Sequence, residues 1–143
     1  MAVLQISLQL EQKPGMLSKI SELLGREGIN IGAISVADAS DTASVRFMCD
    51  DPNKALQVLK NAGYIDASLR EVIAVETPDH PGGLNAVLKP LAVQDINVFY
   101  LYPYLRKIRD NAILIFRVDD IPRAEKVLAE NWIHMLGDEI YSI

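Results

Sequence analysis

An internal repeat constrains the fold of this chain more than any other feature of its sequence. Residues 14–30 and 81–97 both begin with Pro-Gly-x-Leu and end with Ile-Asn, so an offset of 67 residues superposes them. Beyond residue 40 the offset becomes 69, and the two additional residues fall near the segment 105–110, "LRKIRD". A length difference confined to a hairpin tip is typical of a structural duplication. The sequence therefore predicts two copies of one structural unit.

The first copy predicts the element order strand–helix–strand–strand–helix–strand. Apolar and polar residues alternate over 3–10, which is typical of a strand, and apolar residues recur at helical spacing after Pro14. Asp51 followed by Pro52 predicts the start of a second helix. The expected elements are a strand at 3–10, a helix from 16 to about 28, strands at 29–37 and 43–49, a helix from 52 to about 62 and a strand at 68–74.

The second copy predicts the same order, ending in a strand over "EIYSI". Pro90 lies inside its first helix and is expected to kink or shorten it. Because residues 68–77 must end one copy and begin the next, we expect one long strand there, or two strands with almost no turn. The expected elements are a strand at 72–76, a helix at 83–94, strands at 96–104 and 112–118, a helix after Asp120 and a strand at 139–143.

These elements predict an α+β fold of two tandem βαββαβ modules, residues 1–69 and 70–143, with antiparallel sheets packed against helices. A chain of 143 residues suits one ordinary domain or two small ones. The net charge of −5 argues against nucleic-acid binding, and no apolar run approaches the ~18 residues of a membrane span. The single cysteine, Cys49, cannot form an internal disulfide, so we expect a cytoplasmic protein.

Catalytic and cofactor motifs are missing from the sequence. It contains no HExxH, CxxC, P-loop or GxGxxG pattern and no Ser-His-Asp order. We therefore predict no enzyme activity, no cofactor and no metal. Cys49 is expected to be a packed thiol, Trp132 to cap the core, and "LRKIRD" to be a solvated hairpin tip or, less simply, a docking point for an acidic partner.

The repeated polar positions suit a small zwitterion. A helix that begins after Pro-Gly presents unpaired N–H groups at the positive end of its dipole, which attracts a carboxylate. Asn30 and Asn97 each open the following strand, and Asp79 could pair with an ammonium group. The same residues are also ordinary turn residues, so packing alone can explain them. Tyr100, which alternates with two further tyrosines, allows either a doubly buried strand or an aromatic interface wall.

Pro-Gly-x-Leu, an apolar helix and Ile-Asn at fixed spacing, repeated within βαββαβ, resemble the ACT domain, a regulatory amino-acid-binding module. The resemblance covers nearly the whole chain as two tandem copies and implies ferredoxin-like modules that pair side by side. It also implies effector binding near the first strand–helix loop and the strand-opening asparagine. Carried over residue by residue, the predicted site comprises Gln12, Lys13, Pro14, Gly15, Met16, Leu17, Asn30 and Ile31, with Asp79, His80, Pro81, Gly82, Gly83, Leu84, Asn97 and Val98 in the second copy.

Departures from the family pattern indicate the kind of effector. Serine-binding members carry a histidine four residues before the proline, whereas Leu10 and Thr77 stand there in this chain, so a serine pocket is not expected. The apolar neighbours of the loops favour an effector with a hydrophobic side chain. His80 is expected to be a solvated loop residue.

The resemblance implies a regulatory protein that binds a free amino acid or similar effector and signals by inter-module or dimer rearrangement. A homodimer and a partner enzyme of amino-acid metabolism are the expected partners. The alternatives are an ACT interaction scaffold without a ligand and, well behind, a small ferredoxin-like enzyme. Because the two loops differ, one copy can bind while the other only maintains the fold.

Overall fold

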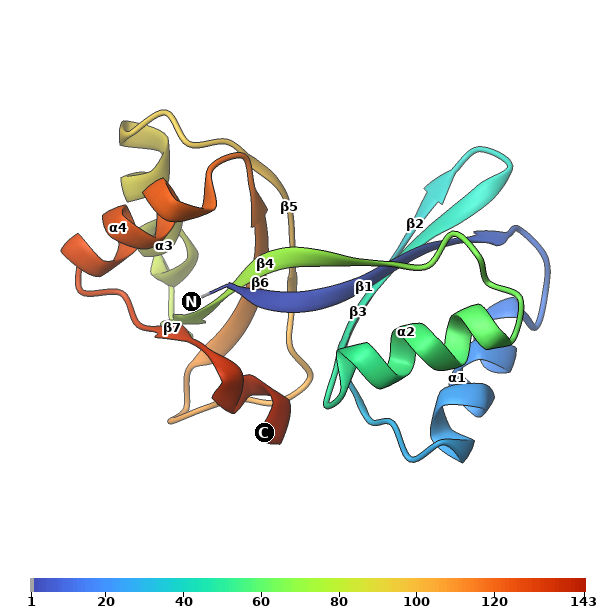
Figure 1. The fold of residues 1–143 in the computed structure, drawn as a ribbon. Coiled ribbons are helices and arrows are strands. Elements are labelled where there is room, and N and C mark those ends of the chain that lie inside the picture. Colours follow the sequence, from blue (N-terminus) through green and yellow to red (C-terminus); the bar gives the residue numbers. More distant parts are fainter. Residues whose placement is uncertain (1) are drawn as a thin grey trace. The chain divides into compact units, whose positions relative to one another are not determined.

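The protein is described by a computed structural model that covers residues 2–143. The chain divides into two compact units (Figure 1). The N-terminal unit comprises Leu4–Arg70, and the C-terminal unit comprises Glu71–Ile143 with the start of the chain up to Val3. Each unit is a layer of helices on an antiparallel sheet, and each is described by itself below.

The N-terminal unit is built around β3, which pairs antiparallel with both β1 and β2. Alternate residues of these strands, among them Ile6 and Phe47, are fully buried and pack against Leu24 of α1 and Leu59 of α2. This period-two burial against two amphipathic helices is what the sequence pattern predicts. The elements are β1 (Val3–Glu11), α1 (Met16–Arg26), β2 (Ile31–Ala39), β3 (Thr42–Cys49) and α2 (Pro52–Asn61).

The C-terminal unit repeats this plan and completes it with a fourth strand. Here β6 pairs with β4 and β5, and β7 adds to the other side of β4. Its core joins Ile73, Val75 and Phe116 of the sheet to Leu91 and Leu128 of the helices. The elements are β4 (Ser68–Thr77), α3 (Gly83–Val93), β5 (Val98–Pro103), β6 (Ala112–Val118), α4 (Ile121–Glu130), β7 (Met135–Leu136) and a 3₁₀ helix (Asp138–Ser142).

Most of the predicted elements are confirmed to within two or three residues at their ends, and β4 is the long strand predicted at the junction. The strand predicted at 139–143 is wrong. The strand that pairs with β4 is the short β7, and the chain beyond Gly137 turns into the 3₁₀ helix. Ile140 is fully buried, and its carbonyl accepts a hydrogen bond from the Tyr104 hydroxyl at 3.3 Å, so the alternation in this segment reflects one buried helical residue.

Of the two effects predicted for Pro90, a kink or a shorter helix, the shorter helix is wrong, since α3 continues to Val93 and is 11 residues long, as α1 is. The prediction for Trp132 is wrong as well. Trp132 does not cap the core, because its side chain is 95% exposed and its backbone adopts a φ of 61°. None of the helices within residues 2–143 is both long enough and apolar enough to span a membrane.

Candidate functional site

The two helices that follow the Pro-Gly turns begin without a side-chain cap. Gly15 and Gly82 occupy their N-cap positions with φ values of 87° and 84°, a left-handed conformation that favours glycine. Neither helix has an acidic residue in its first turn. By contrast, α2 and α4 are capped by Asp51 and Asp120, which accept from the backbone N–H groups three residues later at 3.1 Å. The positive ends of α1 and α3 are therefore the ones left uncompensated.

A cavity of about 260 Å³ adjoins the start of α1 in the N-terminal unit. It includes six of the predicted site residues, and its apolar lining combines the loop with three strands, β1, β2 and β3. The floor and walls are Leu10, Glu11, Gln12, Lys13, Pro14, Gly15, Met16, Leu17, Ser18, Val36 and Ala43. A pocket with a helix N-terminus, a carboxylate and several aliphatic side chains can hold a small zwitterion with an apolar side chain.

The residue two positions before each proline ties the loop to the neighbouring hairpin. The Gln12 amide donates to the Asp38 carboxylate at 3.0 Å and to the Thr42 carbonyl at 3.2 Å. In the second copy Asp79 accepts from the Lys107 ammonium group instead. This hydrogen bond holds the pKa of Asp79 below its ordinary value and raises that of Lys107. In the structure, then, the carboxylate predicted to face a ligand already has a lysine partner.

The two predicted asparagines do not line this cavity. Asn30 donates its backbone N–H to Asp50 Oδ1 at 3.0 Å and accepts from the Asp50 N–H at 3.2 Å, and Asn97 and Asp119 form the same pair. Both asparagines precede the following strand, at the C-terminal end of the helix. An 11-residue helix is about 16 Å long, so α1 separates Asn30 from the Pro-Gly loop of the same unit. Ile31 and Val98 lie beside them, partly buried at the strand starts.

The Pro-Gly loop of the C-terminal unit is closed more tightly than the first. A Cβ atom on Gly83 would lie 1.9 Å from the Pro78 carbonyl oxygen, so no side chain can occupy the place that Met16 takes in the first copy. His80 is exposed, and its Nδ1 lies 2.9 Å from the Pro81 carbonyl oxygen. The remaining predicted residues of this loop, Pro81, Gly82 and Leu84, are exposed. None of these loop residues lines the cavity beside α1 or a second cavity, of about 410 Å³, near the end of β4.

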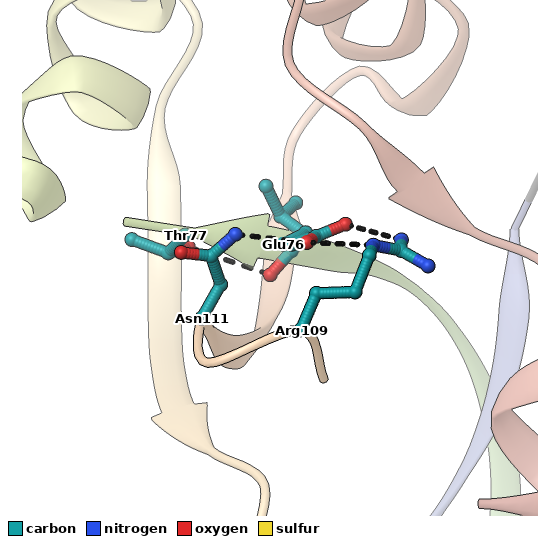
Figure 2. A network of polar contacts seen from close by, with 5 residues as sticks. Glu76, Thr77, Arg109 and Asn111 are labelled. Atoms are coloured by element: carbon teal, nitrogen blue, oxygen red, sulfur yellow. Dashed lines mark hydrogen bonds and ion pairs between the residues drawn. The ribbon is translucent and has the colours of Figure 1, made fainter. Parts of the chain in front are cut away.

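The longer hairpin of the second copy is fastened to the end of β4 by a polar network that sequence reasoning missed (Figure 2). The Glu76 carboxylate accepts from Arg109 Nη2 at 2.7 Å and Nε at 3.3 Å, and from Asn111 Nδ2 at 2.9 Å. These bonds, with Arg109 the larger cause, hold the pKa of Glu76 below its ordinary value. The available signal was the opposite charge of the segments "ETPD" and "LRKIR", so the hairpin is not simply a solvated tip.

Fold and loops together define the class of the protein, a tandem pair of ferredoxin-like modules in which a Pro-Gly turn opens the first helix of each. The family model described as "ACT domain pair" matches residues 1–142. The chain belongs to this family, which confirms the resemblance drawn from the repeat.

Solved structures agree with this assignment. The chain is similar to protein BT0572 from Bacteroides thetaiotaomicron, with 28% identity, a TM-score of 0.91, and coverage of 100% of this chain and 98% of the other. It is also similar in fold to the regulatory subunit of aspartate kinase from Thermus thermophilus in its ligand-free form, with 16% identity, a TM-score of 0.64, and coverage of 90% and 91%. The chain is likewise similar in fold to the regulatory subunit of aspartate kinase from Thermus flavus, with 18% identity, a TM-score of 0.61, and coverage of 90% of this chain and 89% of the other. A search of curated proteins finds no match.

Proposed function

We propose that this protein is a regulatory module that binds a free amino acid with an apolar side chain in the cavity beside the α1 N-terminus. The observation that carries the proposal is the uncapped start of α1 next to an aliphatic pocket, whereas α2 and α4 are capped by aspartates. The ligand carboxylate would bind the free N–H groups. The ammonium group would share the Glu11 carboxylate with Lys13, whose Nζ lies 3.2 Å from Glu11 Oε2. The ligand side chain would contact Leu10 and Val36.

Binding would regulate by linkage. A ligand that prefers one arrangement of the modules or protomers shifts the population towards it, and a partner that reads this arrangement is coupled reciprocally to the ligand. The partner we propose is an enzyme of amino-acid metabolism, because the fold is shared with subunits that regulate aspartate kinase. The protein itself would have no catalytic role, and the cytoplasm would keep its one thiol reduced.

Self-association is proposed through the outer strand of the N-terminal unit. The strand β2 pairs with β3 on one side and ends the strand order on the other. Its residues Ile34 and Val36 are 40% and 46% exposed. An exposed edge with aliphatic side chains favours strand pairing with a second copy, which would form a homodimer next to the cavity that Val36 lines.

The test is a thermal-unfolding screen of the twenty amino acids with two matched variants. A ligand that binds only the folded state raises the melting temperature, and at about 100 times its Kd the gain is ~2.7 kcal/mol. Ser18→Glu places a carboxylate at the third position of α1, where it competes with the ligand carboxylate. Asn85→Glu makes the same change at the equivalent exposed position of α3, which lines neither cavity.

We expect both variants to be stabilised by about 0.3–1 kcal/mol through the helix dipole. Only Ser18→Glu should lose the response to an aliphatic amino acid. An equal response in both variants would refute this binding site. Absence of a response in the native protein to all twenty amino acids would favour the ligand-free scaffold instead, and turnover of an amino-acid substrate would revive the enzyme alternative.

A further inference from the structure

A second and larger cavity, of about 410 Å³, lies in the C-terminal unit and contains none of the predicted site residues. It lies between the end of β4, the first turns of α3 and the end of α4. Its polar lining comes from Glu76, Asn111, Asn131 and His134, and Trp132 lines it as well. The Glu76 side chain is only 9% exposed. A cavity of this size with converging polar groups and an aromatic ring is of the kind that holds small ligands.

Trp132 is held in an unfavourable state at this cavity. Its φ of 61° lies in the left-handed region, and its side chain is 95% exposed. In the first copy the equivalent residue is Gly63, which has a φ of 98° and no such penalty. A bulky residue is unfavourable in this conformation, and a solvated indole recovers little by packing. This conformation ends α4, because the Trp132 and Ile133 N–H groups bond the Ala129 and Leu128 carbonyls, so what distinguishes the second copy is an exposed indole at a helix stop beside a cavity.

The electrostatics of the cavity favour a cation. A basic side chain lies near the C-terminal end of each of the other three helices. Lys54 donates to the Glu27 carbonyl after α1 at 2.7 Å, and Arg123 donates to the Gln94 carbonyl after α3 at 2.6 Å. Lys60, in the last turn of α2, donates to the Ile65 carbonyl at 3.4 Å. Within residues 2–143, no lysine or arginine does this for α4, which ends at the cavity. The last carbonyls of α4 accept from neutral donors instead, the Asn131 amide and the backbone N–H groups of residues 131–133. Among the described residues the negative end of this dipole thus has hydrogen-bond partners but no basic side chain in its last turn.

The repeat shows which residues of the second copy stand where the first has its lysine and that lysine's acceptor. With the offset of 69, Lys60 of α2 corresponds to Ala129 of α4, while Ile65 corresponds to His134, whose carbonyl accepts from the Glu76 N–H at 2.9 Å. Ala129 is exposed, and its uncharged side chain cannot stabilise the negative end of the helix dipole. The Asn131 amide donates to the Val127 carbonyl at 2.8 Å, which leaves its oxygen as an acceptor. The second copy thus lacks the lysine and carries an indole and a buried carboxylate around the same point.

We propose that this cavity binds a small organic cation that carries a primary ammonium or guanidinium group. The cation supplies, near the end of α4, the positive charge that Lys60 supplies near the end of α2. The cation is attracted by the negative end of the α4 dipole and donates a hydrogen bond to the Asn131 side-chain oxygen. It also contacts the face of Trp132, whose π electrons attract positive charge. Arg109 offsets much of the Glu76 charge, so the site recognises a compact monocation or diamine rather than a metal ion.

Intrinsic fluorescence tests this proposal directly, because Trp132 is the single tryptophan of the chain. We would titrate the native protein with 1,5-diaminopentane, lysine, arginine and agmatine, with 1,5-pentanediol as the neutral control, at constant ionic strength. The expected result is a saturable change in Trp132 emission with at least one amine or guanidine and none with the diol. No saturable change with any cation, or the same change with the diol, would overturn the proposal.

Two lysine variants then locate the site. Ala129→Lys restores the cation of the first copy and should weaken binding of the amine at least tenfold while keeping the fluorescent reporter. Ala92→Lys makes the same change at an exposed position near the other end of α3, away from the cavity, and should bind as the native protein does. Trp132→Gly, followed by calorimetry, should lose at least fivefold in affinity. Equal binding by the native protein and Ala129→Lys would refute the site.

The outcome is independent of the proposed amino-acid site. Ser18→Glu changes the cavity of the other unit and should leave the amine titration unchanged. Ala129→Lys should likewise leave the thermal response to aliphatic amino acids unchanged. Loss of both responses in either variant would show that the two cavities are not separate sites and would contradict the proposal as stated.

Discussion

Replacement of Gly83 by alanine measures how tightly the second Pro-Gly loop is closed. The added Cβ would lie 1.9 Å from the Pro78 carbonyl oxygen and 2.8 Å from its carbonyl carbon, with both contacts to backbone atoms. The two segments must separate by roughly 1.5 Å to restore ordinary contact, and overpacking of this kind costs about 1–3 kcal/mol. Alanine favours helices over glycine by at most ~1 kcal/mol, which offsets only part of the loss.

We therefore expect Gly83→Ala to lower the free energy of unfolding by about 2 kcal/mol, which urea unfolding at fixed pH would measure. The melting temperature should fall by roughly 5–15 °C. Gly82→Ala is the control, since its Cβ would meet no atom within 4 Å and its cost arises from the positive φ alone, about 1 kcal/mol. If Gly83→Ala were as stable as the native protein, the loop would have room for a side chain, and the contrast with the first copy would fail.

Three further measurements test other parts of the structure. The pKa of Glu76 is lowered in the folded state, so its bonds to Arg109 stabilise the protein above about pH 4.5. The difference in free energy of unfolding between the native protein and Glu76→Gln should therefore shrink as the pH falls below that value. Burial raises the pKa of Cys49 to about 11, so thiol reagents at pH 8 should label it only as fast as the protein opens. Asp51→Ala and Asp120→Ala each remove a helix cap and should each cost about 1 kcal/mol in chemical unfolding, and a negligible loss in both would refute the capping roles.

Much of the fold could be predicted from local sequence signals that occur in both copies of the repeat. The Asp-Pro pairs at residues 51 and 120 predict two helix starts, and the Pro-Gly pairs predict two more. The end of the chain could not be predicted in this way. Ile140 alternates with polar neighbours as a strand residue would, but its N–H bonds the Gly137 carbonyl at 3.0 Å in a 3₁₀ turn, and its carbonyl accepts from the distant Tyr104 hydroxyl.

The candidate site was less accessible to sequence reasoning because it depends on distant pairings. Asp79 looked free in the sequence, yet Lys107 reaches it across 28 residues, and the length of the second hairpin decides that contact. Trp132 looked like a core residue by composition alone. Its alignment with Gly63 was the available signal that the position requires a left-handed backbone, which a buried tryptophan would seldom adopt.

The duplication explains how two cavities of different character can arise from one module. In the first copy Met16 leaves room at the start of α1, and Lys60 closes the end of α2. In the second copy Gly83 packs against the backbone at the start of α3, Ala129 stands at the position of Lys60, and a cavity adjoins the end of α4. The start of the first helix thus adjoins a cavity in one copy and is closed by backbone in the other, and the second helix has a basic residue in its last turn in the first copy but not in the second. If both proposals hold, a carboxylate is bound at a helix N-terminus in one unit and a cation at a helix C-terminus in the other, so that the module recognises opposite charges with opposite ends of the same dipole.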